Sequence, residues 1–302
     1  MTLKKDNNSG TIWLLLVVLA LIWGTSFILM KRGLYHDGVA VLTPWQVATS
    51  RLAIAWLALS PLLFKHFGLM RKHWLPLIGT GVLGNGIPAF LFATAQSRID
   101  SSLSGMLNSL TPLMTMFVGA LLFGIRMRGA HVIGIILGLI GAAGLIWVKR
   151  GDGTPAWSFY ALLPVIGALC YGISGNIVKR YLYTLPATAT AALALTFVGP
   201  ICLGLALGSG LPETLRTNPQ AWTSLGYIAI LATLSSALAL VLWNKLLQYT
   251  TALRASSVTY LMPVVAIVWG VLDGERVTPP QLAMITLVLS GVYIVSIAER
   301  TR

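Results

Sequence analysis

Apolar residues run in long blocks along this chain, and short polar or basic segments separate the blocks. A helix needs about 20 predominantly apolar residues to cross a bilayer, and the blocks reach that length. Several begin with a polar residue before proline, as at Thr43-Pro44 and Asn218-Pro219, which is typical of a helix start. The pattern predicts ten transmembrane helices, near residues 12–32, 42–64, 74–96, 101–124, 130–148, 156–178, 187–208, 222–248, 254–272 and 278–297.

The chain also repeats itself. Residues 24–34 read GTSFILMKRGL, and residues 172–182, at an offset of 148, read GISGNIVKRYL. Offsets of 150 or 151 continue downstream, between Pro112 and Pro263, Gly119 and Gly270, His131 and Gln281, and Gly141 and Gly291. We therefore predict two five-helix repeats, residues 1–150 and 151–302. Because five is odd, the second repeat enters the membrane from the opposite side, so the fold predicted is an all-α membrane protein of two inverted repeats.

Composition agrees with this pattern. The chain is 56% hydrophobic and 10% charged, whereas a soluble domain carries about 25% charged residues. The net charge is +13, but the basic residues do not cluster beside a polar domain, so we expect no nucleic-acid partner. Thirteen Lys and Arg residues fall in the segments on the side of the termini and seven on the other, which predicts cytoplasmic N- and C-termini. Cys170 and Cys202 lie in apolar runs, so no metal or other cofactor is expected.

Several short motifs, in order along nearly the whole chain, support a family resemblance. They are Trp23–Phe27 with Lys31, Ser50–Leu52, Leu110–Leu113, Leu261–Val264 and Gly274-Glu275. With them the chain resembles the ten-helix EamA-type branch of the drug/metabolite transporter superfamily. The resemblance implies export or exchange of small metabolites, often amino acids, in a bacterial inner membrane, by a monomer or weak homodimer. One departure is that Gly124-Ile125-Arg126 stands where the family often carries a glutamate, so Glu275 has no counterpart in the first half.

Polar and aromatic residues within the predicted spans are the candidates for a substrate site. A polar group in a membrane is costly unless it faces a partner or water, and an aromatic ring can stack on substrate while its polar atom forms a hydrogen bond. The predicted substrate-binding residues are Trp23, Asn85, Asn108, Tyr171, Trp243 and Tyr260. Ordinary packing is the alternative for each. Proline bends helices, so Pro88, Pro112 and Pro263 are predicted hinges, with simple packing kinks as the alternative.

Charged residues are rare inside the spans. Arg51 is the one clear charge deep in a span; it could bind a substrate carboxylate, or bond carbonyls of neighbouring helices, which the resemblance favours. Asp273 and Glu275 are expected at a solvated headgroup position at a span end. Gly134, Gly138 and Gly141 share one helix face, which indicates a close helix contact.

The sequence predicts a secondary transporter rather than an enzyme, exporting or exchanging amino acids by alternating access around a central cavity. The missing mid-span carboxylate favours a neutral, zwitterionic or anionic substrate over an organic cation. The alternative within the fold is an exporter of drugs or of metabolites such as nucleosides, and a passive channel is also open. A remote alternative is an intramembrane serine protease at Ser174, within Gly172–Gly175, but a serine nucleophile needs an adjacent base and all four histidines lie at loops or span ends.

Overall fold

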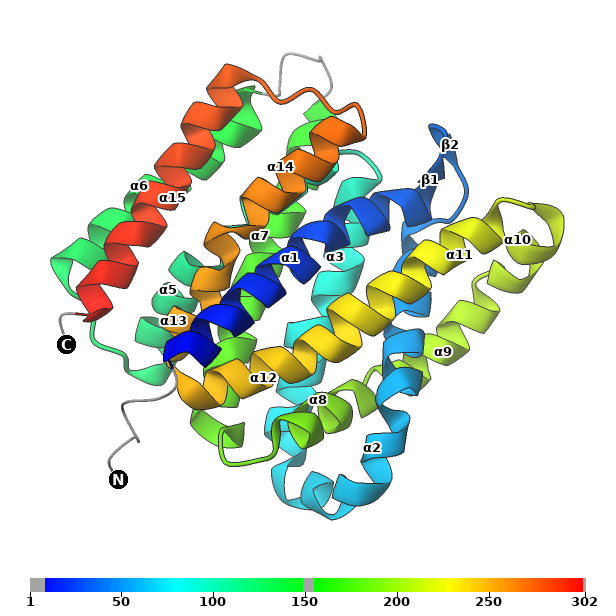
Figure 1. Cartoon of the computed structure of the whole chain (residues 1–302), viewed down its shortest axis with the longest axis horizontal. Coiled ribbons are helices and arrows are strands. Elements are labelled where there is room, and N and C mark those ends of the chain that lie inside the picture. The colour runs from blue at the N-terminus through cyan, green and yellow to red at the C-terminus, as the bar shows by residue number, and fades with distance from the viewer. Residues whose placement is uncertain (1–8, 149–154, 301–302) are drawn as a thin grey trace.

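The computed structural model describes residues 9–148 and 155–300, which are almost entirely helical (Figure 1). The helices are α1 (Ser9–Leu34), α2 (Pro44–Gly81), α3 (Ile87–Gln96), α4 (Ser101–Asn108), α5 (Thr111–Phe123), α6 (Gly129–Val148), α7 (Pro155–Ile177), α8 (Ala187–Thr196), α9 (Gly199–Gly208), α10 (Leu211–Thr217), α11 (Ala221–Ile230), α12 (Ala239–Tyr249), α13 (Ala252–Ser256), α14 (Met262–Leu272) and α15 (Pro279–Arg300). Between them lie the π-helices η1 (Val82–Gly86), η3 (Val178–Leu182) and η4 (Leu231–Leu238), and the 3₁₀-helix η5 (Ser257–Tyr260). A hairpin of β1 (Tyr35–His36) and β2 (Val39–Ala40) follows α1, which the apolar pattern did not predict.

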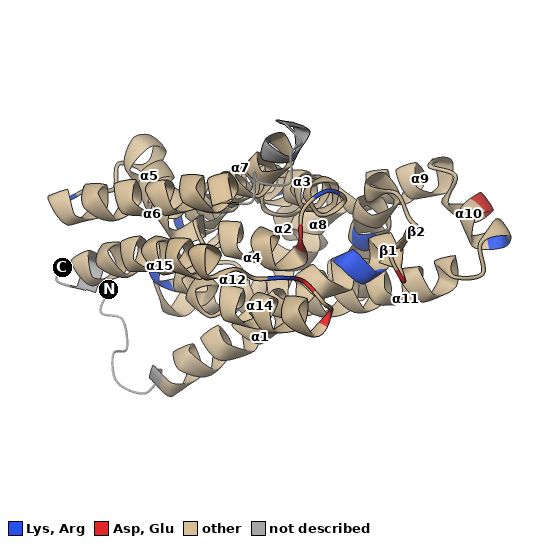
Figure 2. Ribbon diagram, turned by 90° about the horizontal axis from the view of Figure 1, so that it is seen from above, with Lys and Arg blue, Asp and Glu red and all other residues tan. Residues whose placement is uncertain are grey.

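The bundle has the surface of a membrane protein. Eight helical segments of the described chain are long and apolar enough to cross a bilayer, and the bent pair α8–α9 is a ninth candidate. Large apolar side chains face outward, with Phe64 91% and Leu272 73% exposed. Figure 2 shows the charged residues gathered at helix ends and loops, with long uncharged stretches between them. Such a surface is stable against lipid rather than water.

One of the eight segments is too long for a single crossing. It runs from Pro44 to Gln96 through α2, η1 and α3 and has 53 residues, which would extend about 80 Å as one helix, against a hydrocarbon thickness of about 30 Å. His73 has non-helical angles, φ −122° and ψ 22°. Figure 1 shows the chain turning back near the end of α2. The predicted division into 42–64 and 74–96 falls at this turn, although the total of ten crossings stays a prediction.

The predicted span 187–208 is not the continuous helix that hydropathy suggested. It consists of α8 and α9, which meet at a bend of 41°. The break precedes Pro200, which has no amide hydrogen for the carbonyl of Thr196. A second break divides the predicted span 101–124 into α4 and α5. Apolar length alone does not distinguish such broken spans from straight ones.

Helices α6 and α15 pack closely through glycines, as the shared face of Gly134 and Gly141 suggested. A Cβ atom on Gly134 would lie 2.5 Å from the carbonyl oxygen of Gly291, and one on Gly141 would lie 2.9 Å from the carbonyl oxygen of Met284. The Cβ position of Gly138 faces Leu113 of α5, while its backbone also lies close to Gly291 of α15. Small residues allow the two backbones to approach where no side chain would fit.

The starts of these two helices show the internal repeat in atomic contacts. The Arg128 amide donates to Nδ1 of His131 at 2.8 Å, and the Thr278 amide donates to Oε1 of Gln281 at 2.8 Å. Each member of the first pair precedes its counterpart by 150 residues. The same capping role is therefore filled by different side chains in the two halves.

Candidate functional site

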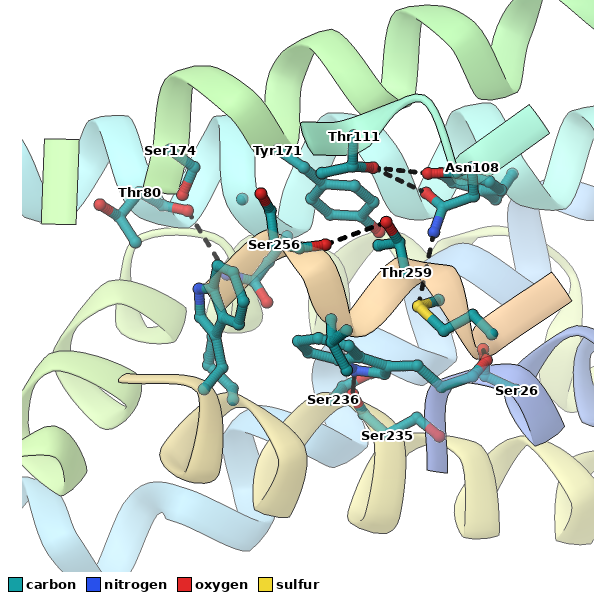
Figure 3. A pocket seen from close by; sticks show the side chains of 18 of the residues that line it. Ser26, Thr80, Asn108, Thr111, Tyr171, Ser174, Ser235, Ser236, Ser256 and Thr259 are labelled. Carbon is teal, nitrogen blue, oxygen red and sulfur yellow. Dashed lines mark hydrogen bonds between the residues drawn. The ribbon is translucent and has the colours of Figure 1, made fainter. Parts of the chain in front are cut away.

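A central cavity lies among helices of both halves (Figure 3). It offers about 110 Å³ for the centres of water-sized molecules. Its walls come from α1–α5, α7, α12–α14 and the irregular segments η1, η3, η4 and η5. Five of the six predicted substrate-binding residues line it, namely Trp23, Asn85, Asn108, Tyr171 and Trp243.

Aromatic rings form much of the wall. Trp23 and Trp243 have ring centroids 5.5 Å apart, and the rings of Phe92 and Tyr171 stack at 5.9 Å with 22° between their planes. The indole nitrogen of Trp23 donates to the carbonyl oxygen of Ser235 in η4 at 3.0 Å. This bond fixes the Trp23 ring against the wall, where its face is suited to a flat or apolar part of a ligand.

The two predicted asparagines have weakly engaged amide groups. Nδ2 of Asn85 lies 3.4 Å from the carbonyl oxygen of Thr80, and Nδ2 of Asn108 lies 3.9 Å from the sulfur of Met262. The first distance is long for a hydrogen bond, and a thioether is a weak acceptor. Both amides therefore retain donor capacity toward the cavity.

Two further polar atoms at the cavity were missed from the sequence. Thr80 Oγ1 and Asn244 Oδ1 are buried and have no hydrogen-bond partner. A buried polar atom without a partner costs about 1–3 kcal/mol, so a ligand that supplies a donor gains by binding there. Asn244 had a readable signal, an amide within a span beside Trp243. Hydroxyl groups at Ser26, Thr111, Ser174, Ser235, Ser236, Ser256 and Thr259 add to the polar lining.

Arg51 reaches the same cavity from α2. Its Nε donates to Oγ of Ser236 at 2.7 Å. Its hydrogen bond goes to a hydroxyl rather than to the helix carbonyls of the structural alternative. No acidic residue lines the cavity in the part of the chain that the structure describes. A fixed positive charge beside neutral hydroxyl and amide groups is chemically suited to a carboxylate.

Tyr260 is the predicted binding residue that the structure does not bring to this cavity. Its hydroxyl donates to the carbonyl oxygen of Val292 at 2.6 Å and lies 2.5 Å from Oγ of Ser296, both on α15. Tyr260 ends the 3₁₀-helix η5, where successive side chains point about 120° apart, so it faces α15 while its neighbour Thr259 lines the cavity. Its hydroxyl joins η5 to α15.

The three predicted hinge prolines all stand in the first turn of a helix, just after an irregular stretch. Pro88 follows η1, Pro112 follows the break between α4 and α5, and Pro263 follows η5. A proline in the first turn sacrifices no helical hydrogen bond, which holds for Pro112 and Pro263. Because η1 runs into α3 without a break, Pro88 instead removes one helical donor. Hinge motion at all three places stays a prediction.

A cluster of ion pairs joins the C-terminal end of α1 to the segment that follows α14. Lys31 Nζ lies 2.6 Å from Oδ2 of Asp273 and 2.8 Å from Oε1 of Glu275, and Arg32 also pairs with Asp273. Oε1 of Glu275 accepts from the amide of Ser101 and Oε2 from that of Ser102, each at 2.9 Å. The Glu275 side chain is 3% exposed and that of Asp273 9%. The expected solvated headgroup position is therefore wrong, because these partners replace water around both carboxylates.

These contacts determine the pKa of Glu275. Burial alone would raise this pKa, but hydrogen bonds from Lys31, Ser102 and Ser101 outweigh burial and lower it from 4.5 to about 2. Glu275 is therefore charged at every physiological pH and ties α14 to α1 and α4.

Ser174, the residue of the remote protease alternative, lines the cavity, but none of the four histidines does, so no histidine of the lining can serve as its base. No group of three or more potential metal ligands from His, Cys, Asp and Glu occurs among the described residues.

Comparisons with known proteins agree with this architecture. A probable amino-acid metabolite efflux pump of Salmonella typhimurium is 29% identical, covering 99% of this chain and 97% of the relative. The inner membrane transporter YedA of Escherichia coli K12, described as uncharacterized, is 25% identical over 94% of this chain and 90% of its own length. A probable terminal-alkyne amino-acid exporter of Streptantibioticus cattleyicolor is 26% identical over 95% and 94%.

A solved crystal structure covers 97% of this chain and 98% of its own with a TM-score of 0.63, at 19% identity, and shows the same fold. The EamA-like transporter family matches twice, at residues 10–147 and 158–297, so each half of the chain is one family unit. The two matches together cover nearly all of the described chain, and this protein belongs to the EamA-like transporter family.

Proposed function

We propose that this protein exports or exchanges amino acids or closely related small metabolites across the bacterial inner membrane, by alternating access around the central cavity. The single observation that carries the substrate class is Arg51, a cavity-lining guanidinium with no acidic residue beside it among the described lining. The names of the relatives from Salmonella typhimurium and Streptantibioticus cattleyicolor point the same way.

The proposed binding mode divides the ligand between two kinds of wall. The carboxylate meets the free guanidinium nitrogens of Arg51, and the ammonium group meets neutral oxygens such as Asn244 Oδ1 and Thr80 Oγ1. The side chain of the amino acid lies against Trp23 and Tyr171. No acidic residue of the described lining is available to hold an isolated cation, which disfavours the organic cations that many drug exporters carry.

The experiment is counterflow in liposomes that contain the purified protein. Vesicles loaded with unlabelled amino acid should take up labelled amino acid faster than empty vesicles, which a passive pore would not show. The amide derivative of the same amino acid, which lacks the carboxylate, should be a poor substrate. Exchange of nucleosides but not of amino acids would contradict the proposed substrate class.

Arg51 provides the matched variants. A hydrogen bond to a charged group contributes about 1.5–3 kcal/mol, so Arg51→Gln should raise the half-saturating amino-acid concentration at least tenfold, and Arg51→Lys less. The amide derivative should be affected little. Arg216→Gln, at an exposed helix end, is the control. An equal loss for acid and amide in Arg51→Gln would instead assign Arg51 to the structure of the bundle.

A further inference from the structure

Helices α5 and α14 match each other in the two halves. Both are followed by a glycine, but the residue after that glycine is apolar in one half and acidic in the other. A glycine in the left-handed conformation follows each helix: Gly124, with φ 71°, comes directly after α5, and Gly274, with φ 84°, comes after α14 and Asp273. The next residue is Ile125 in the first half and Glu275 in the second. Ile125 donates its amide to the carbonyl oxygen of Gly119 at 3.0 Å, and Glu275 donates its amide to that of Gly270 at 2.8 Å. The first bond spans six residues and the second five, so the two turns differ in length by one residue, although Ile125 and Glu275 both directly follow the left-handed glycine.

Their side chains also fill equivalent places. A Cβ atom on Gly119 would lie 2.7 Å from Cδ1 of Ile125, and one on Gly270, its match at an offset of 151, would lie 2.5 Å from Oε2 of Glu275. An apolar side chain thus stands in one half where a carboxylate stands in the other.

The lysine that meets this carboxylate is present in both halves. Lys31 bonds Glu275, and Lys179 matches Lys31 at an offset of 148. With isoleucine in the equivalent place, Nζ of Lys179 donates instead to the carbonyl oxygens of Leu247 at 2.8 Å and Thr250 at 2.7 Å. An ammonium group has three donors, so one remains, and the positive charge has no anionic partner among these contacts.

A second cavity occupies the space around Lys179, with about 180 Å³ for the centres of water-sized molecules. Arg126, the residue after Ile125, also lines it and is exposed at its edge. Ala252 and Leu253 line it as well, and they match Ser101 and Ser102, which bond Glu275 in the other half. No acidic side chain that the structure describes lines this cavity.

We propose that the second cavity binds an oxyanion, a carboxylate or phosphate group, between Lys179 and Arg126, in the place that the Glu275 carboxylate takes in the other half. Two cations that line one cavity repel each other, and a bound anion relieves that repulsion. The anion would also accept the third N–H of the Lys179 ammonium group and the paired N–H groups of the Arg126 guanidinium. The site is separate from the central cavity, although Thr115 at this cavity and Thr111 at the central one are one helical turn apart on α5. The oxyanion could come from a free solute or from an anionic lipid headgroup.

The test is the thermal unfolding of the purified full chain in lipid nanodiscs, at constant pH and ionic strength. In phosphatidylcholine nanodiscs, inorganic phosphate or acetate in place of chloride should raise the melting temperature by a few degrees. Ile125→Glu supplies the carboxylate from within the chain, so it should melt higher without phosphate and respond less to it. Ile125→Gln, of similar shape but uncharged, should still respond.

Further variants and lipids complete the experiment. Arg126→Gln should weaken the response to phosphate, and Arg216→Gln, a remote loss of one positive charge, should not. If phosphatidylglycerol nanodiscs raise the melting temperature of the wild type but not of Ile125→Glu, and free phosphate adds nothing, the ligand is a lipid headgroup. If wild type and Ile125→Glu respond equally to every anion and lipid, the proposal is overturned.

Discussion

Trp23 is the residue that joins the predicted binding function most closely to the structure. It lines the central cavity, contacts Trp243, and is held by its bond to Ser235. An aromatic contact contributes about 0.5–1.5 kcal/mol beyond its buried area, so Trp23→Ala should raise the half-saturating substrate concentration about two- to tenfold. Trp23→Phe, which keeps a ring, should raise it less.

Transport kinetics in liposomes with matched amounts of folded protein measure this effect. A thiol introduced by Trp23→Cys should also react with a small aqueous reagent and be protected by substrate. An active carrier whose Trp23→Cys thiol is inert from both sides would contradict a substrate-facing Trp23.

Glu275 gives a prediction with a defined pH window. Its pKa is lowered from 4.5 to about 2 in the folded chain, so its stabilisation is full above about pH 4.5 and is lost as the pH falls toward about 2. Glu275→Gln removes one of the two carboxylates that pair with Lys31. It should lower the free energy of unfolding by about 1–3 kcal/mol at neutral pH. The difference between wild type and variant should shrink as pH falls through the window.

Thermal unfolding in detergent between pH 7 and pH 3 provides the measurement. Glu213→Gln, at an exposed position on α10, is the matched control and should change little. A difference between Glu275→Gln and wild type that is the same at both pH values would show that the carboxylate charge does not stabilise this cluster.

Single residues also show where sequence interpretation reaches its limit. Trp23, Asn85 and Asn108 could be placed at a cavity because aromatic and amide groups within apolar spans are conspicuous; their part in binding stays a prediction. Thr80 could not, because a threonine can bond its own helix and gives no sign of where its hydroxyl points. Tyr260 was chosen because it is an aromatic residue within a span, and residue type alone does not show that its hydroxyl is engaged by α15 rather than by the cavity.

Among the helices, the tightly packed pair α6–α15 offers the clearest mutational contrast. A Cβ atom on Gly291 would lie 2.8 Å from the amide nitrogen of Gly138, so Gly291→Ala forces the helices apart and should cost about 1–3 kcal/mol. Gly226 on α11 has open space around its Cβ position. There alanine should be neutral or stabilise by up to about 1 kcal/mol through helix propensity.

Melting temperatures of the two variants should therefore move in opposite directions or differ clearly. Similar shifts for Gly291→Ala and Gly226→Ala would mean that the close contact between α6 and α15 relaxes at little cost.

The irregular helical segments were only partly predictable. Pro88 was a predicted hinge, and the π-helix η1 ends at Gly86, two residues before it. The π-helix η4 carries Ser235 and Ser236 to the cavity without glycine or proline, so its sequence gives no such signal. It packs mainly against α2 and also against α1, where the carbonyl oxygen of Ser235 accepts from Trp23. Apolar periodicity predicts helices but not the local winding that tertiary contacts select.

At the scale of the whole molecule, topology is the decisive prediction. Figure 1 shows the start of α1 and the end of α15 toward the same side of the bundle, and the basic residues predict that this side is cytoplasmic. A reporter fused after Arg302 should be active only if it works in the cytoplasm. With five crossings in the first half, a thiol introduced by Gly151→Cys should react with an impermeant reagent from the periplasm; labelling from the cytoplasm would contradict inverted repeats.

If the protein works by the proposed alternating access, the different partners of Lys31 and Lys179 affect how empty molecules divide between the two conformers. Opening the end held by Lys31, Asp273 and Glu275 separates ion pairs, whereas the opposite end, at Lys179, has carbonyl partners instead. Under alternating access, a difference of about 2.8 kcal/mol between conformers would leave about 1% of empty molecules open at the Lys31 end. Most empty molecules would then be open at the Lys179 end. This end is predicted to face the cytoplasm, which is the side from which an exporter binds its substrate.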